Sequence, residues 1–230
     1  MRKLLIAAVV LLILGVAADF AAARVFEDRV TDVLQREYGL ARRPVVQVRD
    51  FPFLPRLAGG RLQTVDVAAT DVAAGGLNAA RLVLHLHDVR VPRDVLLGEP
   101  GRVDVGRADG QLELTEAEVN RLLAERLPGG SLAIGENGVR VRLRTELLGQ
   151  PVEAVATGRL GVRGNAITFT PEKVQLGGGL DPGLSSQVAP LLAVRVPLPE
   201  LPAGLRLEGV DTRPGAVVLT GRAAAVSVAT

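Results

Sequence analysis

Alternation of apolar and polar residues recurs along most of this chain and constrains its fold more than any other feature. The clearest case is 139–148, where valine and leucine on one face alternate with arginine and glutamate on the other. A period of two is typical of a β-strand with one buried face. Shorter patterns bounded by Gly, Pro or Asn cover 46–48, 62–70, 81–89, 102–106, 111–114, 131–135, 152–162, 166–170, 205–212 and 216–228. We therefore expect an α+β fold that is mostly antiparallel β.

Helical patterns interrupt the strands at a few places. Over 20–38 the apolar residues fall at helical spacing, and Gly39 follows where a left-handed C-terminal cap is usual. The capping box Thr115-Glu116-Ala117-Glu118 predicts a second helix that ends at Pro128. A short helix is also expected over 182–192, although a proline within it opposes helix formation.

The first residues have the layout of a secretory signal. Two basic residues precede the unbroken apolar run 4–18, and Asp19 interrupts the run before further apolar residues bring it to spanning length. Two outcomes stay open, cleavage after Ala23 with secretion, or retention of 1–23 as a membrane anchor. Because basic residues favour the cytoplasmic side, either outcome places 24–230 outside the cytoplasm. We expect 24–230 to form a single β-rich domain.

Composition argues against several classes of partner. The chain has no cysteine, which excludes disulfides and thiolate chemistry, and its 27 basic residues nearly balance 25 acidic ones. It has no tryptophan and one tyrosine, whereas nucleic-acid and sugar sites usually stack their ligands on aromatic rings. We expect no nucleic-acid partner, and the sequence specifies no protein partner.

Residues that could carry catalysis or hold a metal are sparse. His85 and His87 are the only histidines, and they share one face of an expected strand. Without a cysteine or an evident third ligand, they do not predict a metal site. The serines lack a nucleophile elbow, and Gly177-Gly178-Gly179 lacks the context of a phosphate-binding loop. We therefore expect no catalytic residue, no cofactor and no enzyme activity.

Apolar side chains around the first helix are candidate lipid contacts. An amphipathic helix against a curved antiparallel sheet leaves an apolar groove that suits an acyl chain. Phe51-Pro52-Phe53-Leu54-Pro55 is expected to be a loop or a strand edge, because its prolines cannot donate ladder hydrogen bonds. The residues expected to contact lipid are Phe26, Val30, Leu34, Phe51, Phe53 and Leu54.

An arginine stripe is a second candidate surface. Arg140, Arg142 and Arg144 share the polar face of the strand expected over 139–148. The stripe is either a solvated sheet face or a surface that meets anionic lipid headgroups. The pattern alone does not separate these two interpretations.

Taken in order, these elements resemble the actinobacterial LmeA-type phospholipid-binding proteins of the cell envelope. The resemblance rests on the basic and apolar start, the helix over 24–38 and the segment Val46-Gln47-Val48-Arg49-Asp50-Phe51-Pro52-Phe53-Leu54. It includes Gly60, Val65, Val67, Leu114-Thr115 and Leu198-Pro199-x-x-Pro202-x-Gly204-Leu205, while Asp50 stands where the family usually has a small residue.

The resemblance implies a fold similar to tubular lipid-binding domains, with an elongated curved sheet wrapped around the long N-terminal helix and lipid between them. It implies non-enzymatic phospholipid binding at the outer side of the cytoplasmic membrane, in envelope lipid or lipoglycan maturation. The alternative is an envelope structural or protein-interaction module without a lipid ligand. Only Phe51, Pro52, Phe53 and Leu54 carry over residue by residue, and their contact with lipid is our hypothesis.

Overall fold

The structure is a computed structural model that describes residues 2–74, 76–96, 99–135, 138–147, 150–177, 189–190, 192–198, 201 and 204–229. Its helices are α1 (Arg2–Glu37), α2 (Phe53–Ala58), α3 (Arg93–Leu96) and α4 (Glu116–Ala124). Its strands are β1 (Val45–Val48), β2 (Arg61–Ala74), β3 (Leu77–Arg90), β4 (Arg102–Thr115), β5 (Gly130–Gly135), β6 (Gly138–Leu147), β7 (Gln150–Val162), β8 (Ala166–Leu176), β9 (Arg195–Pro197), β10 (Arg206–Arg213) and β11 (Ala216–Ala229).

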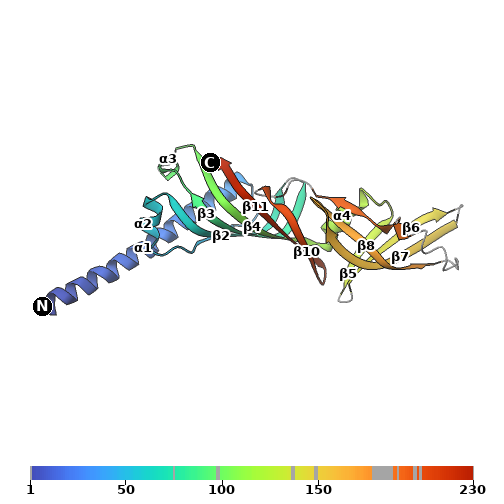
Figure 1. Cartoon of the computed structure of the whole chain (residues 1–230), viewed down its shortest axis with the longest axis horizontal. Coiled ribbons are helices and arrows are strands. Elements are labelled where there is room, and N and C mark those ends of the chain that lie inside the picture. The colour runs from blue at the N-terminus through green and yellow to red at the C-terminus, as the bar shows by residue number, and fades with distance from the viewer. Residues whose placement is uncertain are drawn as a thin grey trace. The chain divides into compact units, whose positions relative to one another are not determined.

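The strands form two sheets, and the fold is the mostly antiparallel α+β fold that the alternation predicted (Figure 1). A curled six-stranded sheet has the order β1-β2-β3-β4-β11-β10, and a five-stranded sheet has the order β5-β6-β7-β8-β9. Strand β1 is therefore an edge strand, and it pairs antiparallel with β2 through Val46 opposite Val67. An edge strand leaves half of its backbone groups available to other elements.

The chain divides into two compact units. The first comprises residues 1–70, 83–109 and 223–230, and the second comprises 71–82 and 110–222. Helices α1 and α2 and strand β1 belong to the first unit, whereas α4 and the five-stranded sheet belong to the second. Each unit has its own apolar core. Fully buried residues include Phe53 and Leu62 in the first unit, and Leu114, Leu123, Val141, Leu192 and Val217 in the second.

Helix α1 is continuous from the N-terminal apolar segment into the amphipathic segment. It ends as the sequence predicted, because Gly39 adopts a φ of 58° and the N–H of Leu40 donates to the carbonyl of Gln35 at 3.0 Å. One face of the helix is covered at a spacing of three or four residues. That face comprises Val16, Asp19, Ala22, Ala23, Phe26, Glu27, Val30, Thr31 and Leu34. The covered face thus begins inside the predicted export segment.

The length and hydropathy of the described helices also bear on the predicted anchor. Among the residues that the structure places, no helix combines the length and the apolar character needed to cross a membrane.

Helix α4 begins with the predicted cap. The side chain of Thr115 accepts a hydrogen bond from the N–H of Glu118 at 3.2 Å, as a capping box requires. The carboxylate of Glu118 is used elsewhere, since it accepts from the N–H of Asn78 at 2.9 Å and from Nη2 of Arg121 at 2.7 Å. It therefore ties α4 to the start of β3. The helix ends at Ala124, earlier than the predicted end at Pro128.

The predicted hairpins of the second unit are confirmed. Strands β5 and β6 pair with Ile134 opposite Val139, and β7 and β8 pair with Val162 opposite Ile167. Alternation in β6 buries Val139, Val141 and Leu143 and exposes the arginines between them. The turn residues Glu136 and Asn137 lie outside the described residues, as does most of the helix expected over 182–192.

Two predictions of local structure are wrong. The segment after Pro52 is the short helix α2 rather than a loop or strand. Its Pro55 is tolerated because N–H groups in the first turn of a helix have no partner within the helix. The strands predicted over 102–106 and 111–114 are one strand, β4. Gly106 does not end it, because a Cβ there would come within 2.9 Å of the Cβ of Asp88, so close pairing with β3 requires glycine.

Candidate functional site

A groove of about 550 Å³ lies between α1 and β1 in the first unit. Its volume falls within the range of roughly 300–1,000 Å³ found for small-ligand sites. One wall is a face of α1, formed by Asp19, Phe20, Ala23, Arg24, Glu27, Asp28 and Thr31. The other wall is residues 43–51 together with Phe53. The groove therefore combines charged groups with aliphatic and aromatic side chains.

Asp19 fixes residues 51–54, which we call the phenylalanine segment. Its carboxylate, which is 6% exposed, accepts hydrogen bonds from the backbone N–H groups of Phe53 and Leu54, both at 2.7 Å. These are the first amides of α2, whose N-cap residue Pro52 provides no side-chain hydrogen bond. The two hydrogen bonds offset the cost of burying a carboxylate. A residue of the predicted export segment thus caps a helix of the folded unit.

Glu27 holds the edge of β1 against α1. Its carboxylate accepts a hydrogen bond from the N–H of Val48 at 2.8 Å and lies 4.0 Å from Nε of Arg24. Asp50 lies two residues after the end of β1. Its carboxylate accepts a hydrogen bond from the N–H of Gln63, which fixes the backbone immediately before the phenylalanine segment. The residue that departs from the family pattern therefore has a structural partner in β2.

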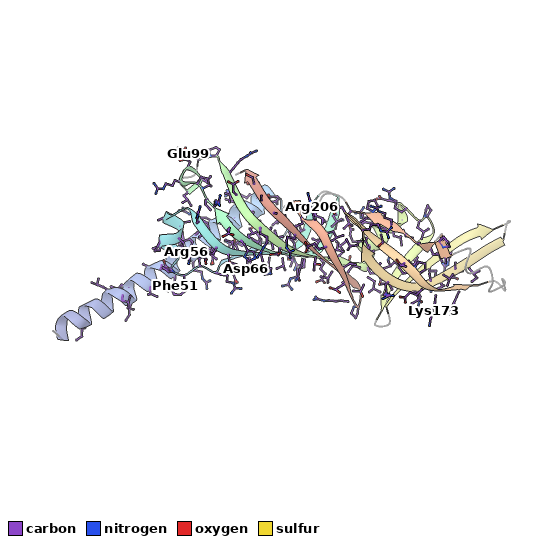
Figure 2. All side chains as sticks on the ribbon, viewed as in Figure 1. Phe51, Arg56, Asp66, Glu99, Lys173 and Arg206 are labelled. Carbon is purple, nitrogen blue, oxygen red and sulfur yellow. The ribbon has the colours of Figure 1, made fainter. Side chains whose placement is uncertain are left out.

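Phe51 and Phe53 have different environments. Phe53 is 1% exposed and packs against Phe26, with ring centroids 5.4 Å apart. Phe51 is 56% exposed and stacks on Phe20, with centroids 5.7 Å apart, at the side of α1 (Figure 2). Phe53 is thus a core residue that also borders the groove, whereas Phe51 lies at the groove's outer surface.

The structure brings together part of the predicted set of lipid contacts. Phe51 and Phe53 line the groove, and Phe26 lies behind Phe53. Val30 and Leu34 are half-buried on α1, and Leu54 is exposed, and none of these three lines the groove. Sequence reasoning missed Asp19 and Phe20, whose signal was a lone acidic residue followed by an aromatic residue within an apolar run.

Basic side chains flank the groove. Arg43 bridges Asp28 and Asp32 at 3.2 and 3.0 Å, so its charge is already paired. The side chain of Arg24 is 86% exposed and only loosely paired with Glu27, so it can reach a phosphate at the rim.

The arginine stripe belongs to the second unit, on the exposed face of β6. Arg142 and Arg144 lie 2.8 and 3.9 Å from Glu153 on β7. Arg140 lies on the same face, opposite Thr157. One carboxylate therefore offsets part of the charge of the stripe.

The histidines lie on one face of β3, as predicted, but each meets a different carboxylate. His85 Nδ1 lies 2.7 Å from Asp66, and His87 Nε2 lies 3.5 Å from Asp109. Burial alone would raise the pKa of Asp66, but hydrogen bonds from His85 and Arg49 outweigh it and lower the pKa. Within the described residues, no three His, Asp or Glu side chains gather as metal ligands.

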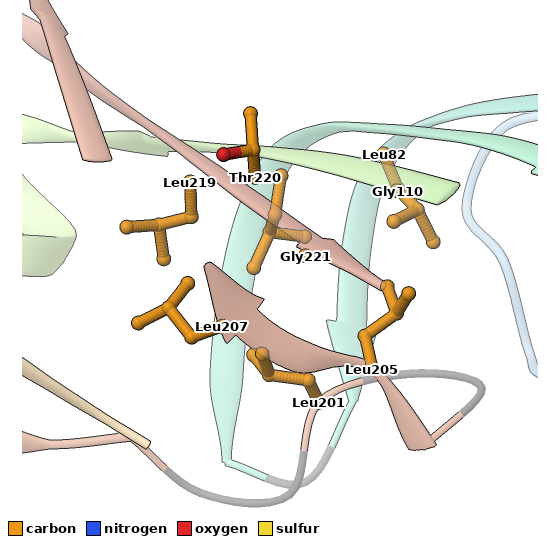
Figure 3. Close-up of a pocket in the computed structure, with 9 residues that line it drawn as sticks. Leu82, Gly110, Leu201, Leu205, Leu207, Leu219, Thr220 and Gly221 are labelled. Atoms are coloured by element: carbon orange, nitrogen blue, oxygen red, sulfur yellow. The ribbon is translucent and has the colours of Figure 1, made fainter. Parts of the chain in front are cut away.

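A second, narrower cavity lies within the second unit. Its walls are leucines, glycines and Thr220 from β3, β4, β10 and β11 and the segment before β10, including Leu82, Leu201, Leu205, Leu207 and Leu219 (Figure 3). Its free volume is about 10 Å³, which is about the space of one water molecule. The leucine side chains fill it, so an acyl chain would enter only if they moved.

Comparison with known families now complements this geometry. Residues 17–222 match the LmeA-like phospholipid-binding family. The chain belongs to this family. The LmeA-like match begins within α1, before Asp19, and it covers both walls of the groove. Neither a curated protein nor a solved structure matches the chain.

Proposed function

We propose that this protein binds phospholipid without transforming it, at the outer side of the cytoplasmic membrane, in the maturation of envelope lipid or lipoglycan. The observation that carries the proposal is the groove bordered by Phe51 and Phe53 in a member of a phospholipid-binding family. The apolar wall suits an acyl chain, and the exposed guanidinium of Arg24 suits the phosphate. The groove thus offers both kinds of contact that a phospholipid needs.

The non-enzymatic part of the proposal is supported by the positions of the histidines. His85 and His87 pair with Asp66 and Asp109 on β3's neighbours, and neither histidine lines the groove. A general base must come within hydrogen-bond reach of the group that it activates. A ligand in the groove is therefore bound beside carboxylates that already accept backbone hydrogen bonds, as Asp19 and Glu27 do.

The proposed location is supported by the predicted export segment, which we propose stays attached to the mature protein. Asp19 is buried and caps α2, and Ala22 and Ala23 are half-buried on the covered face of α1. Cleavage after Ala23 would remove Asp19 and leave the N–H groups of Phe53 and Leu54 without their acceptor. Retention keeps the groove wall intact and keeps the apolar start of α1 beside the lipid-binding unit.

The test is mass spectrometry of organic extracts from the natively purified full chain, with lipid quantified per chain after extensive detergent exchange. Ala23 lines the groove, so Ala23→Phe places a bulky ring in it. Ala21 is exposed on the same helix and outside the groove, so Ala21→Phe is the matched control. We expect phospholipid with the unmodified chain and with Ala21→Phe, and a loss of most of it with Ala23→Phe.

Each other outcome has a definite meaning. If the unmodified chain carries no lipid, the protein is an envelope interaction module whose groove is unoccupied by lipid, and the proposal fails. If Ala23→Phe retains as much lipid as Ala21→Phe, the lipid lies elsewhere, and the leucine cavity around Leu207 and Leu219 becomes the next site to fill. Turnover of the bound lipid during incubation would contradict the non-enzymatic function.

A further inference from the structure

Three large apolar side chains form an exposed patch at the outer surface of the groove. Phe20, Phe51 and Leu54 are 59%, 56% and 43% exposed, and we call them the docking patch. Phe20 and Phe51 are stacked on each other, and Leu54 is held by the carboxylate that immediately precedes Phe20. Single exposed apolar residues are normal on protein surfaces, but aromatic residues gathered in one place mark an interaction site.

The docking patch is held in place by the folded unit. Asp19 fixes the backbone at both Phe53 and Leu54. The buried ring of Phe53 packs on Phe26 of α1. Phe20 follows Asp19 on α1, so the carboxylate of Asp19 connects the helix residue of the patch to the segment that carries Phe51 and Leu54. A preorganised apolar surface loses little conformational entropy when it inserts into a partner.

The surroundings of the docking patch indicate which partner it meets. Leu11, Leu12, Ile13 and Leu14 of α1 are exposed, and Leu14 is about 9 Å along the helix from Phe20. Arg24, whose side chain is 86% exposed, lines the groove about one helical turn after Phe20. Aromatic rings between an apolar helix surface and a basic side chain match the layers of a bilayer, from acyl chains through the interface to anionic headgroups.

We infer that the docking patch inserts into the interfacial layer of a phospholipid bilayer, with Arg24 against anionic headgroups. Phe20 and Phe51 belong both to the docking patch and to the groove wall. Insertion therefore opens the groove directly onto the layer in which phospholipids lie. This inference goes beyond lipid binding, because it identifies the surface through which lipid passes between membrane and protein.

Fluorescence can test the insertion, because the chain has no tryptophan. Leu54→Trp places one reporter in the docking patch but outside the groove lining. Tyr38→Trp is the matched control, since Tyr38 on the same unit is 56% exposed. The full chain is reconstituted into vesicles of phosphatidylglycerol and phosphatidylethanolamine whose acyl chains are brominated near the headgroup. We expect a blue shift and quenching for Leu54→Trp, and emission unchanged from buffer for Tyr38→Trp.

Two results would overturn the inference. One is Leu54→Trp emission that is not blue-shifted in vesicles and is still quenched by aqueous iodide. The docking patch would then bind a protein partner rather than a bilayer. The other is equal bromine quenching in Leu54→Trp and Tyr38→Trp, which would reflect nonspecific adsorption. Vesicles of phosphatidylcholine alone should reduce the quenching of Leu54→Trp, because Arg24 then loses its anionic partner.

A separate arm keeps this inference distinct from lipid binding in the groove. A short-chain brominated phospholipid, used below its micelle concentration, reaches the groove without forming a bilayer. It should quench the tryptophan of Phe51→Trp, which lines the groove, and spare that of Leu54→Trp. If neither is quenched while vesicles still quench Leu54→Trp, membrane docking stands and the groove function fails. If only the monomeric lipid quenches, the reverse holds.

Discussion

The carboxylate of Asp19 lies 2.7 Å from the backbone nitrogen of Phe53, across 34 residues of sequence. This contact joins the apolar N-terminal segment to the phenylalanine segment that borders the groove. Because both partners are buried, the hydrogen bond does not compete with water. The N-terminal segment is therefore a structural part of the first unit, and several measurable consequences depend on it.

Asp19→Asn should destabilise the first unit by about 1–3 kcal/mol, because an amide supplies one oxygen acceptor where two backbone N–H groups need partners. Urea unfolding of the full chain in mild detergent, followed by circular dichroism, measures the loss. Asp28→Asn is the control, since Asp28 forms an exposed ion pair with Arg43 worth at most about 1 kcal/mol. Equal unfolding midpoints for the two variants would contradict the structural function of Asp19.

The mature protein should retain residues before Asp19. Intact-mass measurement of the chain purified from an expressing bacterium checks this directly. A mature N-terminus at Arg24 would show that α2 is capped in another way and that the groove lacks Asp19, Phe20 and Ala23 from its wall.

Phe53 and Phe51 should respond differently to truncation. Phe53→Ala removes a fully buried ring packed on Phe26, so we expect a loss of about 3–5 kcal/mol. Phe51→Ala removes only an exposed ring stacked on Phe20, so we expect no more than about 1 kcal/mol. The same urea measurement compares them. A large stability loss in Phe51→Ala would mean that Phe51 belongs to the core rather than to the docking patch.

Acid should weaken the second unit through Glu118. Hydrogen bonds from Arg121 chiefly, and also from Asn78, outweigh the effect of burial and lower the pKa of Glu118 from 4.5 to about 2. A depressed folded-state pKa gives stability that is present above pH 4.5 and is lost as the pH falls toward 2. Thermal unfolding of the full chain as a function of pH measures this loss.

The matched variant for this acid effect is Glu118→Gln, which cannot ionise. It should be less stable than the unmodified chain at neutral pH by about 2–3 kcal/mol, because glutamine offers Arg121 and Asn78 one acceptor oxygen and no negative charge. The difference between the two proteins should shrink as the pH falls from 4.5 toward 2. A difference that stays constant over this range would assign the acid sensitivity to another carboxylate.

Much of the fold was predictable because burial on one face imposes a period of two on the sequence. Strand β6 is the clearest example, since Val139, Val141 and Leu143 are buried and the arginines between them are exposed. The end of α1 at Gly39 and the start of α4 at Thr115 were predictable because helix caps use local side-chain and backbone chemistry.

The errors arose where a distant residue decides a local conformation. Helix α2 has six residues, including Pro55, and its N-cap is Pro52. Its first two amides are satisfied by Asp19 of another helix. Gly106 resembles a strand end in the sequence, but its missing side chain makes room for Asp88, which adopts a φ of 54° on β3. Neither contact can be predicted from the local sequence pattern.

The candidate site was predictable only in part for the same reason. Phe51 and Phe53 are two residues apart and would share one face of a strand. At the start of a helix they diverge, so one enters the core and the other stays at the surface. Phe20 was missed because an apolar N-terminal run is interpreted as an export signal rather than as part of a folded unit.

Glu27 has a consequence for how copies of this protein behave at high concentration. Unpaired edge strands are templates on which a second chain can add a strand and start aggregation. Here the open edge of β1 lies against α1, and the carboxylate of Glu27 occupies the N–H of Val48. The same helix that forms a wall of the groove therefore also prevents neighbouring molecules from extending the sheet at this edge, which keeps crowded copies separate.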